Sequence, residues 1–242
     1  MNALARLQVS AFVASPCGGV RAEVAGAGVL LRPSGALWIE AAAMLVAADL
    51  HLEKGSAYAA RGQLLPPYDT GETLRRLAAE VEALRPRTVV FLGDTLHDGR
   101  AESRMAPQDE ERLGLLARGR ALVWVVGNHD ADGPRRLAGD VAAELSVSGL
   151  CLRHEPKAGL QDGEAAGHLH PCARVVARGK SVRRRCFITD GQRMILPAFG
   201  AYAGGLSVRD AAFSGMFVRQ PVVVALGTGR AHAVPWAAVV GE

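Results

Sequence analysis

The stretch that decides the fold covers residues 44–51 and reads Met-Leu-Val-Ala-Ala-Asp-Leu-His. Its first five residues are apolar, which predicts a buried strand over residues 44–48, and polar residues follow at once. The same order returns in the run Thr88 to Leu92 before Gly93-Asp94, and in the run Ala121 to Val126 before Gly127-Asn128-His129-Asp130. Helical segments separate the three runs. We therefore expect a βαβαβ unit with a parallel sheet whose faces are covered by helices.

The two segments between these strands carry helical signals. In the first, we expect Asp69 to cap a helix, with Glu72 three residues on, and Pro86 to end it. Its apolar residues share one face and are Leu74, Leu77, Ala78, Val81 and Leu84. The second helix is predicted over Pro107 to Arg118, with an apolar stripe of Leu113, Leu116 and Ala117. The residues between Asp49 and Asp69 are rich in glycine and proline and are expected to form a loop.

The chain on either side of this unit is typical of β structure. Residues from about Leu7 to Glu40 alternate apolar and polar side chains around glycine turns, which predicts two or three antiparallel strands. Beyond Leu150 we expect six short strands, over residues 150–153, 172–177, 186–189, 193–196, 221–226 and 231–234. The predicted fold is α/β, a two-sheet β-sandwich flanked by helices, formed by a single domain over residues 1–242.

Composition and charge limit the class of protein. With 242 residues and 49% apolar content, the chain can bury a substantial core. A net charge of +4 and a pI near 9.1 permit a polyanionic partner without requiring one. The four cysteines include no Cys-x-x-Cys pair, which favours free thiols in a reducing compartment. No stretch approaches the roughly 20 apolar residues of a membrane span, and the run from Leu7 to Ala14 is interpreted as a strand rather than a signal sequence, so we expect a cytoplasmic protein.

Five short polar motifs fall where apolar runs end, and they contain five of the seven histidines. They are Asp49-Leu50-His51, Gly93-Asp94, Gly127-Asn128-His129-Asp130, His154 and Gly167-His168-Leu169-His170. Loops at strand ends converge on one edge of a sheet, so these groups can meet. The candidate metal ligands are Asp49, His51, Asp94, Asn128, His154, His168 and His170.

The type and number of these ligands indicate the metal chemistry. Carboxylates combined with imidazoles suit Mn, Fe, Co, Ni or Zn better than Mg or Ca. Seven ligands are too many for one tetrahedral ion, but they suffice for two ions that share a carboxylate roughly 3.5–4 Å apart, an arrangement used to cleave phosphate esters. Each motif alone has an ordinary explanation, such as a turn or an alternating strand with solvated imidazoles. All five in order favour a metal site.

In order, the five motifs resemble the pattern of the calcineurin-like metallophosphoesterase superfamily. A closer resemblance, over nearly the whole chain, is to the bacterial ligase-associated DNA damage response endonuclease family. It rests on residues 48–55 (Ala-Asp-Leu-His-Leu-Glu-Lys-Gly), 64–70 (Leu-Leu-Pro-Pro-Tyr-Asp-Thr) and 196–205 (Leu-Pro-Ala-Phe-Gly-Ala-Tyr-Ala-Gly-Gly). This resemblance implies a Mn-dependent DNA nuclease, functionally linked to an ATP-dependent DNA ligase, a helicase and a nuclease.

The superfamily resemblance also implies how the ligands divide. One metal would be held by Asp49, His51 and His170 and the other by Asn128, His154 and His168, with Asp94 bridging them. A carboxylate with two oxygens can serve two cations and offsets part of their repulsion. Water held between the ions would lose a proton near neutral pH, and that hydroxide is the expected nucleophile for in-line attack on phosphorus.

Two further histidines are candidates for catalysis. By the resemblance, His129 lies beside the leaving group as general acid; the alternative is that it only hydrogen-bonds a backbone carbonyl. His97 falls in Gly93-Asp94-Thr95-Leu96-His97, and Gly-Asp-x-x-His resembles the double-strand-break repair nucleases of the superfamily, which favours phosphodiester substrates. Alternatively, His97 is an ordinary loop histidine and Asp98 orients the catalytic one.

Basic residues near the motifs are candidates for binding substrate phosphates. Lys54, Arg61 and Arg100 follow the first two motifs closely enough to reach the cleft. The densest basic cluster is Lys180 with Arg183-Arg184-Arg185, for which a solvated hairpin is an equal alternative. Aromatic residues make up only 5% of the chain, so base stacking is not supported beyond Tyr68 and Tyr202.

The predicted function is that of a two-metal phosphoesterase, a DNA endonuclease or phosphodiesterase in DNA repair. One alternative is a phosphomonoesterase or a nucleotide pyrophosphohydrolase that uses the same two metals. A second alternative is a scaffold on a metallophosphoesterase fold that has lost catalysis, and it is disfavoured because no ligand of the pattern is missing.

Overall fold

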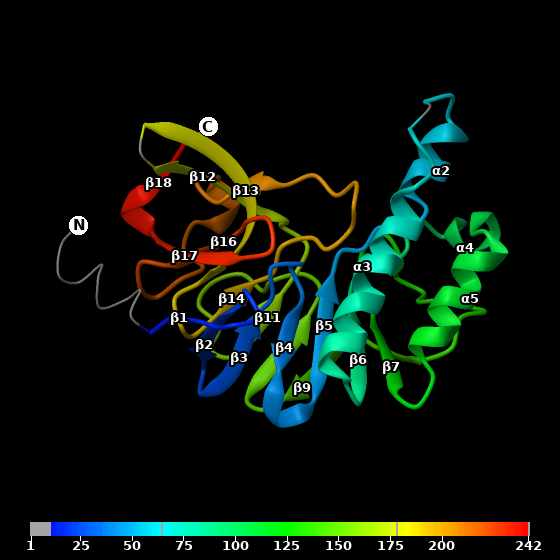
Figure 1. Cartoon of the computed structure of the whole chain (residues 1–242), viewed down its shortest axis with the longest axis horizontal. Coiled ribbons are helices and arrows are strands. Elements are labelled where there is room, and N and C mark those ends of the chain that lie inside the picture. Colours follow the sequence, from blue (N-terminus) through cyan, green and yellow to red (C-terminus); the bar gives the residue numbers. More distant parts are fainter. Residues whose placement is uncertain (1–10, 64, 178, 242) are drawn as a thin grey trace.

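The first of two sheets carries the strands that precede Asp49, Asp94 and Asn128. The structure is a computed structural model and describes residues 11–63, 65–177 and 179–241. Within these residues the sheet has eight strands in chain order (Figure 1). They are β1 (Val13–Ala14), β2 (Val20–Val24), β3 (Ala27–Leu31), β4 (Leu37–Ile39), β5 (Met44–Ala48), β6 (Thr88–Leu92), β7 (Ala121–Val125) and β8 (Asp140–Ala142). Pairing is antiparallel from β1 to β5 and parallel from β5 to β8, so the predicted parallel unit is confirmed.

The second sheet is formed by the C-terminal part of the chain. In the described residues its strands are β9 (Glu144–Val147), β10 (Leu150–Arg153), β11 (Glu164–Ala166), β12 (Pro171–Ala177), β13 (Lys180–Thr189), β14 (Met194–Ile195), β15 (Leu206–Ser207), β16 (Val222–Leu226), β17 (Ala231–Pro235) and β18 (Val239–Val240). The order is β15-β12-β13-β14-β11-β10-β9, while β16 pairs with β13 and β17, and β18 pairs with β12. All six predicted strands occur here, but β13 begins six residues earlier than expected because its first half forms an exposed hairpin with β12.

Two helices, α3 (Asp69–Leu84) and α5 (Pro107–Leu116), cover the outer face of the first sheet (Figure 1). The shorter helix α2 (Lys54–Ala59) projects beyond the sheet and contacts α3 and the short helix α4 (Ala101–Arg104). Three short 3-10 turns are η1 (Glu40–Ala42), η2 (Ala211–Phe213) and η3 (Trp236–Ala238). Leu77 of α3 and Leu113 of α5 pack with Phe91 and Trp124 of the sheet, as the predicted apolar faces require. None of the helices in the described part of the chain combines the length and the apolar character that crossing a bilayer requires.

The main core lies between the two sheets. Val46 and Val90 of the first sheet belong to one buried cluster with Leu152, Phe187 and Val224 of the second. Burying each such side chain stabilises the fold by roughly 1.5–3 kcal/mol. The two sheets therefore pack face to face, and the predicted two-sheet α/β sandwich flanked by helices is confirmed.

Two expectations about the segment after β5 were wrong. Asp69 does not cap α3, because it is the first residue of that helix and its Oδ2 accepts a hydrogen bond from the Gly55 N–H at 2.9 Å. Residues 54–59, expected to be loop, form α2. Tertiary contacts account for α2: the Glu53 N–H donates to Thr70 Oγ1 at 2.8 Å, and this hydroxyl donates back to Glu53 Oε1 at 2.9 Å.

Strand register brings the polar motifs together. Ala48, Leu92 and Val125 end β5, β6 and β7 side by side, so the loops that follow them leave the same edge of the first sheet. In the second sheet, Arg153 of β10 pairs with Ala166 of β11 in parallel, which places His154 beside Gly167. An isolated bridge between Ala48 and Ala198 connects this edge to the C-terminal part of the chain.

Candidate metal centre

Five of the candidate ligands have a left-handed backbone conformation. The φ angles are 53° at Asp49, 46° at His51, 46° at Asp94, 67° at His168 and 45° at His170. Such angles are uncommon for residues with a Cβ atom and cost of order 1–3 kcal/mol each. Their concentration in one place indicates that the fold stores strain there to aim these side chains.

The first group of ligands combines two imidazoles and a carboxylate. Nε2 of His51 lies 3.3 Å from Nε2 of His170, which is itself 3.3 Å from Asp49 Oδ1. Asp49 and His51 are buried and His170 is half-buried. Burial, together with the neighbouring imidazoles of His170 and His129, lowers the pKa of His51 to about 2, so this ring is neutral and can offer a lone pair.

The second group lies next to the first. Nε2 of His154 is 2.9 Å from Asn128 Oδ1, 3.1 Å from His168 Nδ1 and 3.4 Å from Asp94 Oδ1. The other oxygen of Asp94, Oδ2, lies 4.0 Å from Nε2 of His51 in the first group. Asp94 therefore stands between the two groups, as expected for a shared carboxylate.

The donor atoms fit divalent cations. In each of the triads Asp49–His51–His170 and Asp94–His154–His168, one ligand atom per residue lies within 4.8 Å of the others. Nδ1 of both His51 and His154 is buried without a hydrogen-bond partner in the described residues, although each ring has its Nε2 close to a nitrogen of another histidine. Buried imidazoles and carboxylates with these unsatisfied atoms are the donor set that transition-metal ions prefer.

Three glycines allow the loops to approach this closely. A Cβ atom on Gly93 would lie 2.2 Å from the His154 ring, and one on Gly127 would lie 2.3 Å from Asp94 Oδ1. A Cβ atom on Gly167 would lie 2.6 Å from Asp49 Oδ2. The glycines of the motifs are therefore required by packing against the ligands.

Asp130 is a residue whose role the sequence analysis missed. Its Oδ1 accepts hydrogen bonds from the N–H groups of Gly127 (2.8 Å) and Asp94 (3.2 Å), and its Oδ2 accepts from Thr95 (2.8 Å) and Leu96 (3.1 Å). Burial, with a contribution from Asp94, raises the pKa of Asp130. The side chain joins the loop after β7 to the loop after β6. The sequence feature that could have indicated this role is the position of Asp130, directly after His129 and fourth in the motif Gly-Asn-His-Asp.

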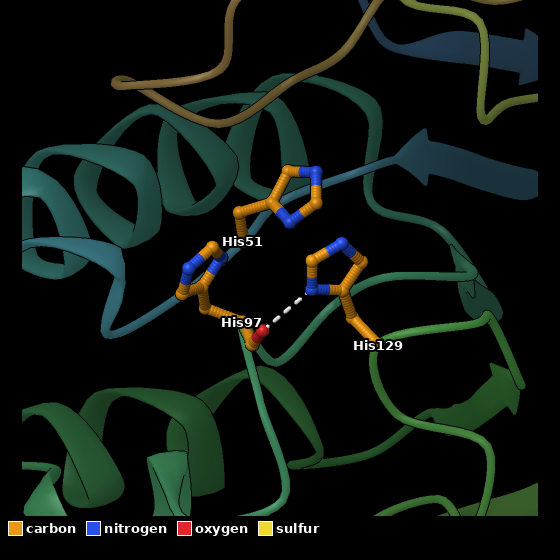
Figure 2. Close-up of side chains that lie close together, drawn as sticks. All are labelled: His51, His97 and His129. Carbon is orange, nitrogen blue, oxygen red and sulfur yellow. Dashed lines mark hydrogen bonds between the residues drawn. The ribbon is translucent and has the colours of Figure 1, made fainter. Parts of the chain in front are cut away.

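A third group, of three histidines, shares His51 with the first group (Figure 2). His51, His97 and His129 have ring centroids 5.1–5.6 Å apart, and the rings of His97 and His129 are stacked. Nδ1 of His129 is 2.7 Å from the His97 carbonyl oxygen, so its N–H donates there and fixes the tautomer. Nε2 of His129 remains, 3.9 Å from Asp94 Oδ2. His129 thus makes the hydrogen bond to a backbone carbonyl that the alternative interpretation predicted. Its Nε2 nevertheless faces the metal ligand Asp94.

Asp98 does not orient His129. Its two oxygens accept hydrogen bonds from Nη2 of Arg104 at 2.9 and 3.0 Å, and Oδ1 also accepts from the Arg100 N–H. Although partial burial opposes the effect, these hydrogen bonds hold the pKa of Asp98 below its usual range. His129 is oriented by the His97 backbone instead.

The three predicted phosphate-binding residues are not equivalent. Burial is the main cause that lowers the pKa of His97, and the positive charges of Lys54 and Arg61 lower it further. Both side chains therefore lie near the His97 ring. Arg100 is exposed and immediately precedes α4. The structure thus brings Lys54 and Arg61 toward the histidines, while nothing in it directs the Arg100 side chain there.

A small cavity lies next to one of the candidate ligands. Its volume is about 210 Å³, and its lining includes Asn128, His129 and Asp130 together with Leu96, Asp98 and Gly99. A larger groove, of about 1120 Å³, runs between α3 and α5 and contains none of the candidate ligands.

Comparisons with known proteins place these features in context. The family model for calcineurin-like phosphoesterases matches residues 43–174, which contain all seven candidate ligands. The crystal structure of Pseudomonas putida nuclease MPE is similar over 89% of this chain and 100% of that chain, with 26% identity and a TM-score of 0.67. A phosphoesterase from E. coli, Yfce, matches over 79% of this chain and 98% of that chain, with 15% identity and a TM-score of 0.39. None of the curated proteins matches the chain.

Proposed function

Because this chain belongs to the calcineurin-like phosphoesterase family and is a metal-dependent phosphoester hydrolase, we propose that it cleaves phosphodiester bonds in DNA with two bound metal ions. The observation that carries the proposal is Asp94, whose two oxygens lie 3.4 Å from Nε2 of His154 and 4.0 Å from Nε2 of His51. A carboxylate between two sets of nitrogen and oxygen donors suits a pair of cations.

The two triads would hold the ions, and Asn128 would complete the second set. Divalent ions bound there would make water more acidic and neutralise charge on the phosphoryl oxygens. The mixture of imidazole and carboxylate ligands supports a transition metal, and we propose manganese.

The protein itself provides the proton for the leaving group. His129 donates its Nδ1 proton to the His97 carbonyl, so Nε2 is the atom that would carry a transferable proton. General acids of this kind typically give about 10²–10⁴-fold in rate. His97 stacks on His129, and with Lys54 and Arg61 it would contact the non-reacting part of a diester.

Two observations support diesters over monoesters. The similar Pseudomonas putida protein is a nuclease, and His97 takes the place of the second aspartate in the Gly-Asp-x-x-Asp form of the motif. We further propose that the substrate is DNA under repair. The protein would act in the same repair process as an ATP-dependent DNA ligase, a helicase and a nuclease.

The test compares two small substrates and one large one. We expect Mn-loaded protein to hydrolyse bis(p-nitrophenyl) phosphate faster than p-nitrophenyl phosphate, and to nick supercoiled plasmid DNA. The Asp94→Ala variant serves as the control for contaminating nucleases. Hydrolysis of the monoester alone would contradict this proposal and indicate a phosphomonoesterase. No activity on any of the three substrates would favour a scaffold protein that has lost catalysis.

A further inference from the structure

A hollow lined by arginines lies beside the metal centre. Its volume is about 430 Å³, and its lining includes Arg183, Arg184 and Arg185 of β13 and residues of the 201–204 segment. None of the described residues that line it carries a carboxylate, and none is aromatic. The described lining therefore contributes three positively charged side chains and no negatively charged one.

The hollow is connected to a candidate metal ligand through the backbone. The Leu206 N–H, two residues after the last lining residue of the 201–204 segment, donates to the carbonyl of the ligand His170 at 3.0 Å. β12 begins at Pro171, directly after His170, and its Ala173 pairs with Arg184. At about 3.3 Å per residue, Arg184 lies opposite a point on β12 about 10 Å along the strand from His170.

The three arginines are held in different ways. Nη1 of Arg185 donates to the carbonyls of Ala198 and Gly200, both at 2.9 Å, and burial lowers the pKa of this guanidinium without removing its charge. Nη2 of Arg183 donates to the Gly205 carbonyl at 2.6 Å. Arg184 is exposed and donates from Nη1 to the Arg183 carbonyl. Arg185 is structural, whereas the exposed Arg184 side chain bonds only a neighbouring backbone carbonyl among the described residues.

Like charges face each other on the same hairpin. Arg174 of β12 lies directly opposite Arg183 of β13, and Nε of Arg174 is buried with no hydrogen-bond partner in the described residues. Residues directly opposite each other on paired strands share one face of the sheet, so both residues add positive charge to the same face of the hairpin. The hairpin lies on the side of the molecule where β18 pairs with β12 (Figure 1).

We propose that this hollow and the β12–β13 hairpin bind backbone phosphates of a nucleic-acid strand, adjacent to the phosphate held at the metal centre. The inference rests on the proposed nuclease function and adds a second contact region to it. Guanidinium groups match phosphate geometry, and the absence of aromatic residues from the lining excludes base stacking there. Contacts to phosphates position the strand without reading its sequence.

The test separates long substrates from short ones. We would measure kcat/KM for a fluorescent single-stranded DNA oligonucleotide and for bis(p-nitrophenyl) phosphate, at 0.05–0.3 M salt, for wild type, Arg184→Gln and Arg183→Gln/Arg184→Gln. If the double variant loses two phosphate contacts, its slope of log kcat/KM against log salt for the oligonucleotide should become shallower by roughly 1.4. This corresponds to a loss of about 25-fold in kcat/KM at 0.1 M salt. Hydrolysis of the small diester should stay unchanged.

A matched control removes two charges elsewhere. Arg87 and Arg118 are exposed and lie outside the lining of the hollow, so Arg87→Gln/Arg118→Gln should keep the wild-type slope. An unchanged slope in Arg183→Gln/Arg184→Gln, an equal loss in the control, or an equal loss on the small diester would each overturn the inference while the nuclease proposal stands. A wild type that hydrolyses the small diester but not the oligonucleotide would end the nuclease proposal itself, and this inference with it.

Discussion

At the scale of single residues, the candidate ligands are held by local geometry that would be unfavourable elsewhere. Asp49 accepts the His168 N–H on both carboxylate oxygens, at 3.1 and 3.0 Å, while His129 donates its N–H to Asp94 Oδ1 at 2.9 Å. Both carboxylates are thereby fixed before any cation binds. Holding the ligands in this way strains the metal-free protein, but it raises the affinity for metal because the ligands need not be ordered when the ion binds.

Replacing the shared carboxylate should remove both ions. Asp94→Ala takes away the carboxylate whose two oxygens face His154 of one triad and His51 of the other, so we expect bound Mn to fall from two ions per chain to fewer than one. Metal analysis of the gel-filtered protein would measure this. Asp98→Asn is the matched control, because Asp98 bonds Arg104 rather than any ligand and its loss should leave two ions. Retention of both ions by Asp94→Ala would contradict the assignment of Asp94.

Replacing the proposed acid should affect substrates according to their leaving groups. A deoxyribose alkoxide needs a proton as it leaves, whereas p-nitrophenolate is a weak base and needs little help. His129→Gln should therefore lower turnover of DNA by about 10²–10⁴-fold, leave hydrolysis of bis(p-nitrophenyl) phosphate much less affected, and retain the metal. Equal losses on both substrates, or loss of the metal, would show that His129 does something other than donate a proton.

Adding a single methyl group behind the second triad should displace a ligand. Gly93 has φ of 70° and its Cβ would enter the His154 ring, so Gly93→Ala combines backbone strain with a steric clash. We expect a loss of about 1–3 kcal/mol in the free energy of unfolding, measured in urea, together with weaker metal binding. Gly99→Ala provides the comparison, because nothing lies within 4 Å of its Cβ. Similar effects from both substitutions would mean that the Gly93 contact is not specific.

At the scale of elements, the segment around Phe199 braces the strand that delivers Asp49. The Phe199 N–H donates to the Ala48 carbonyl at 2.8 Å, and the Gly200 N–H donates to that of Asp49 at 3.2 Å. Arg76 of α3 holds the same segment by donating to the Phe199 carbonyl at 3.0 Å and by stacking on its ring at 4.6 Å. Burial, reinforced by Arg185, lowers the pKa of Arg76 to about 10, which leaves it charged at neutral pH.

Removing the other arginine of this brace should weaken the first metal triad indirectly. Arg185→Met would leave the buried carbonyls of Ala198 and Gly200 without their donor, which costs about 1–3 kcal/mol. We expect a lower unfolding midpoint and a weaker affinity for Mn, both measured by calorimetry. Arg184→Gln changes the neighbouring arginine, whose side chain bonds only the Arg183 carbonyl in the described residues, and should preserve both properties. Normal Mn affinity in Arg185→Met would show that the brace does not reach Asp49.

Sequence patterns predicted the elements that are determined locally. The apolar runs at residues 44–48 and 88–92 coincide with β5 and β6, and the stripe from Leu74 to Leu84 lies on α3. What escaped prediction depends on partners distant in sequence. Asp69 bonds Gly55 instead of its own helix, and Asp130 joins two loops through four backbone N–H groups. Periodicity contains no information about such contacts, because they exist only once the parallel strands have aligned.

At the scale of the whole molecule, the candidate metal centre connects the two sheets. The first triad combines Asp49 and His51, which follow β5, with His170, which precedes β12; the second combines Asp94, which follows β6, with His154 and His168, which follow β10 and β11. Ions bound at this edge would therefore stabilise the packing of one sheet on the other. They would also offset the strain at the five left-handed ligands and the mutual repulsion of the buried carboxylates.

Removal of the ions should consequently lower thermal stability. Metal present at 100 times its Kd contributes about 2.7 kcal/mol per site, and 1 kcal/mol shifts the midpoint of a chain of this length by roughly 2–4 °C. We expect EDTA to lower the melting midpoint by about 5–10 °C per site and added Mn to restore it, as measured by calorimetry. Protons compete with metal for imidazole, so the stabilisation should shrink as the pH falls. The Asp94→Ala variant should melt at the same temperature with and without Mn. A wild-type midpoint insensitive to EDTA, in protein whose metal has been shown to be removed, would mean that the two sheets dock without help from the ions.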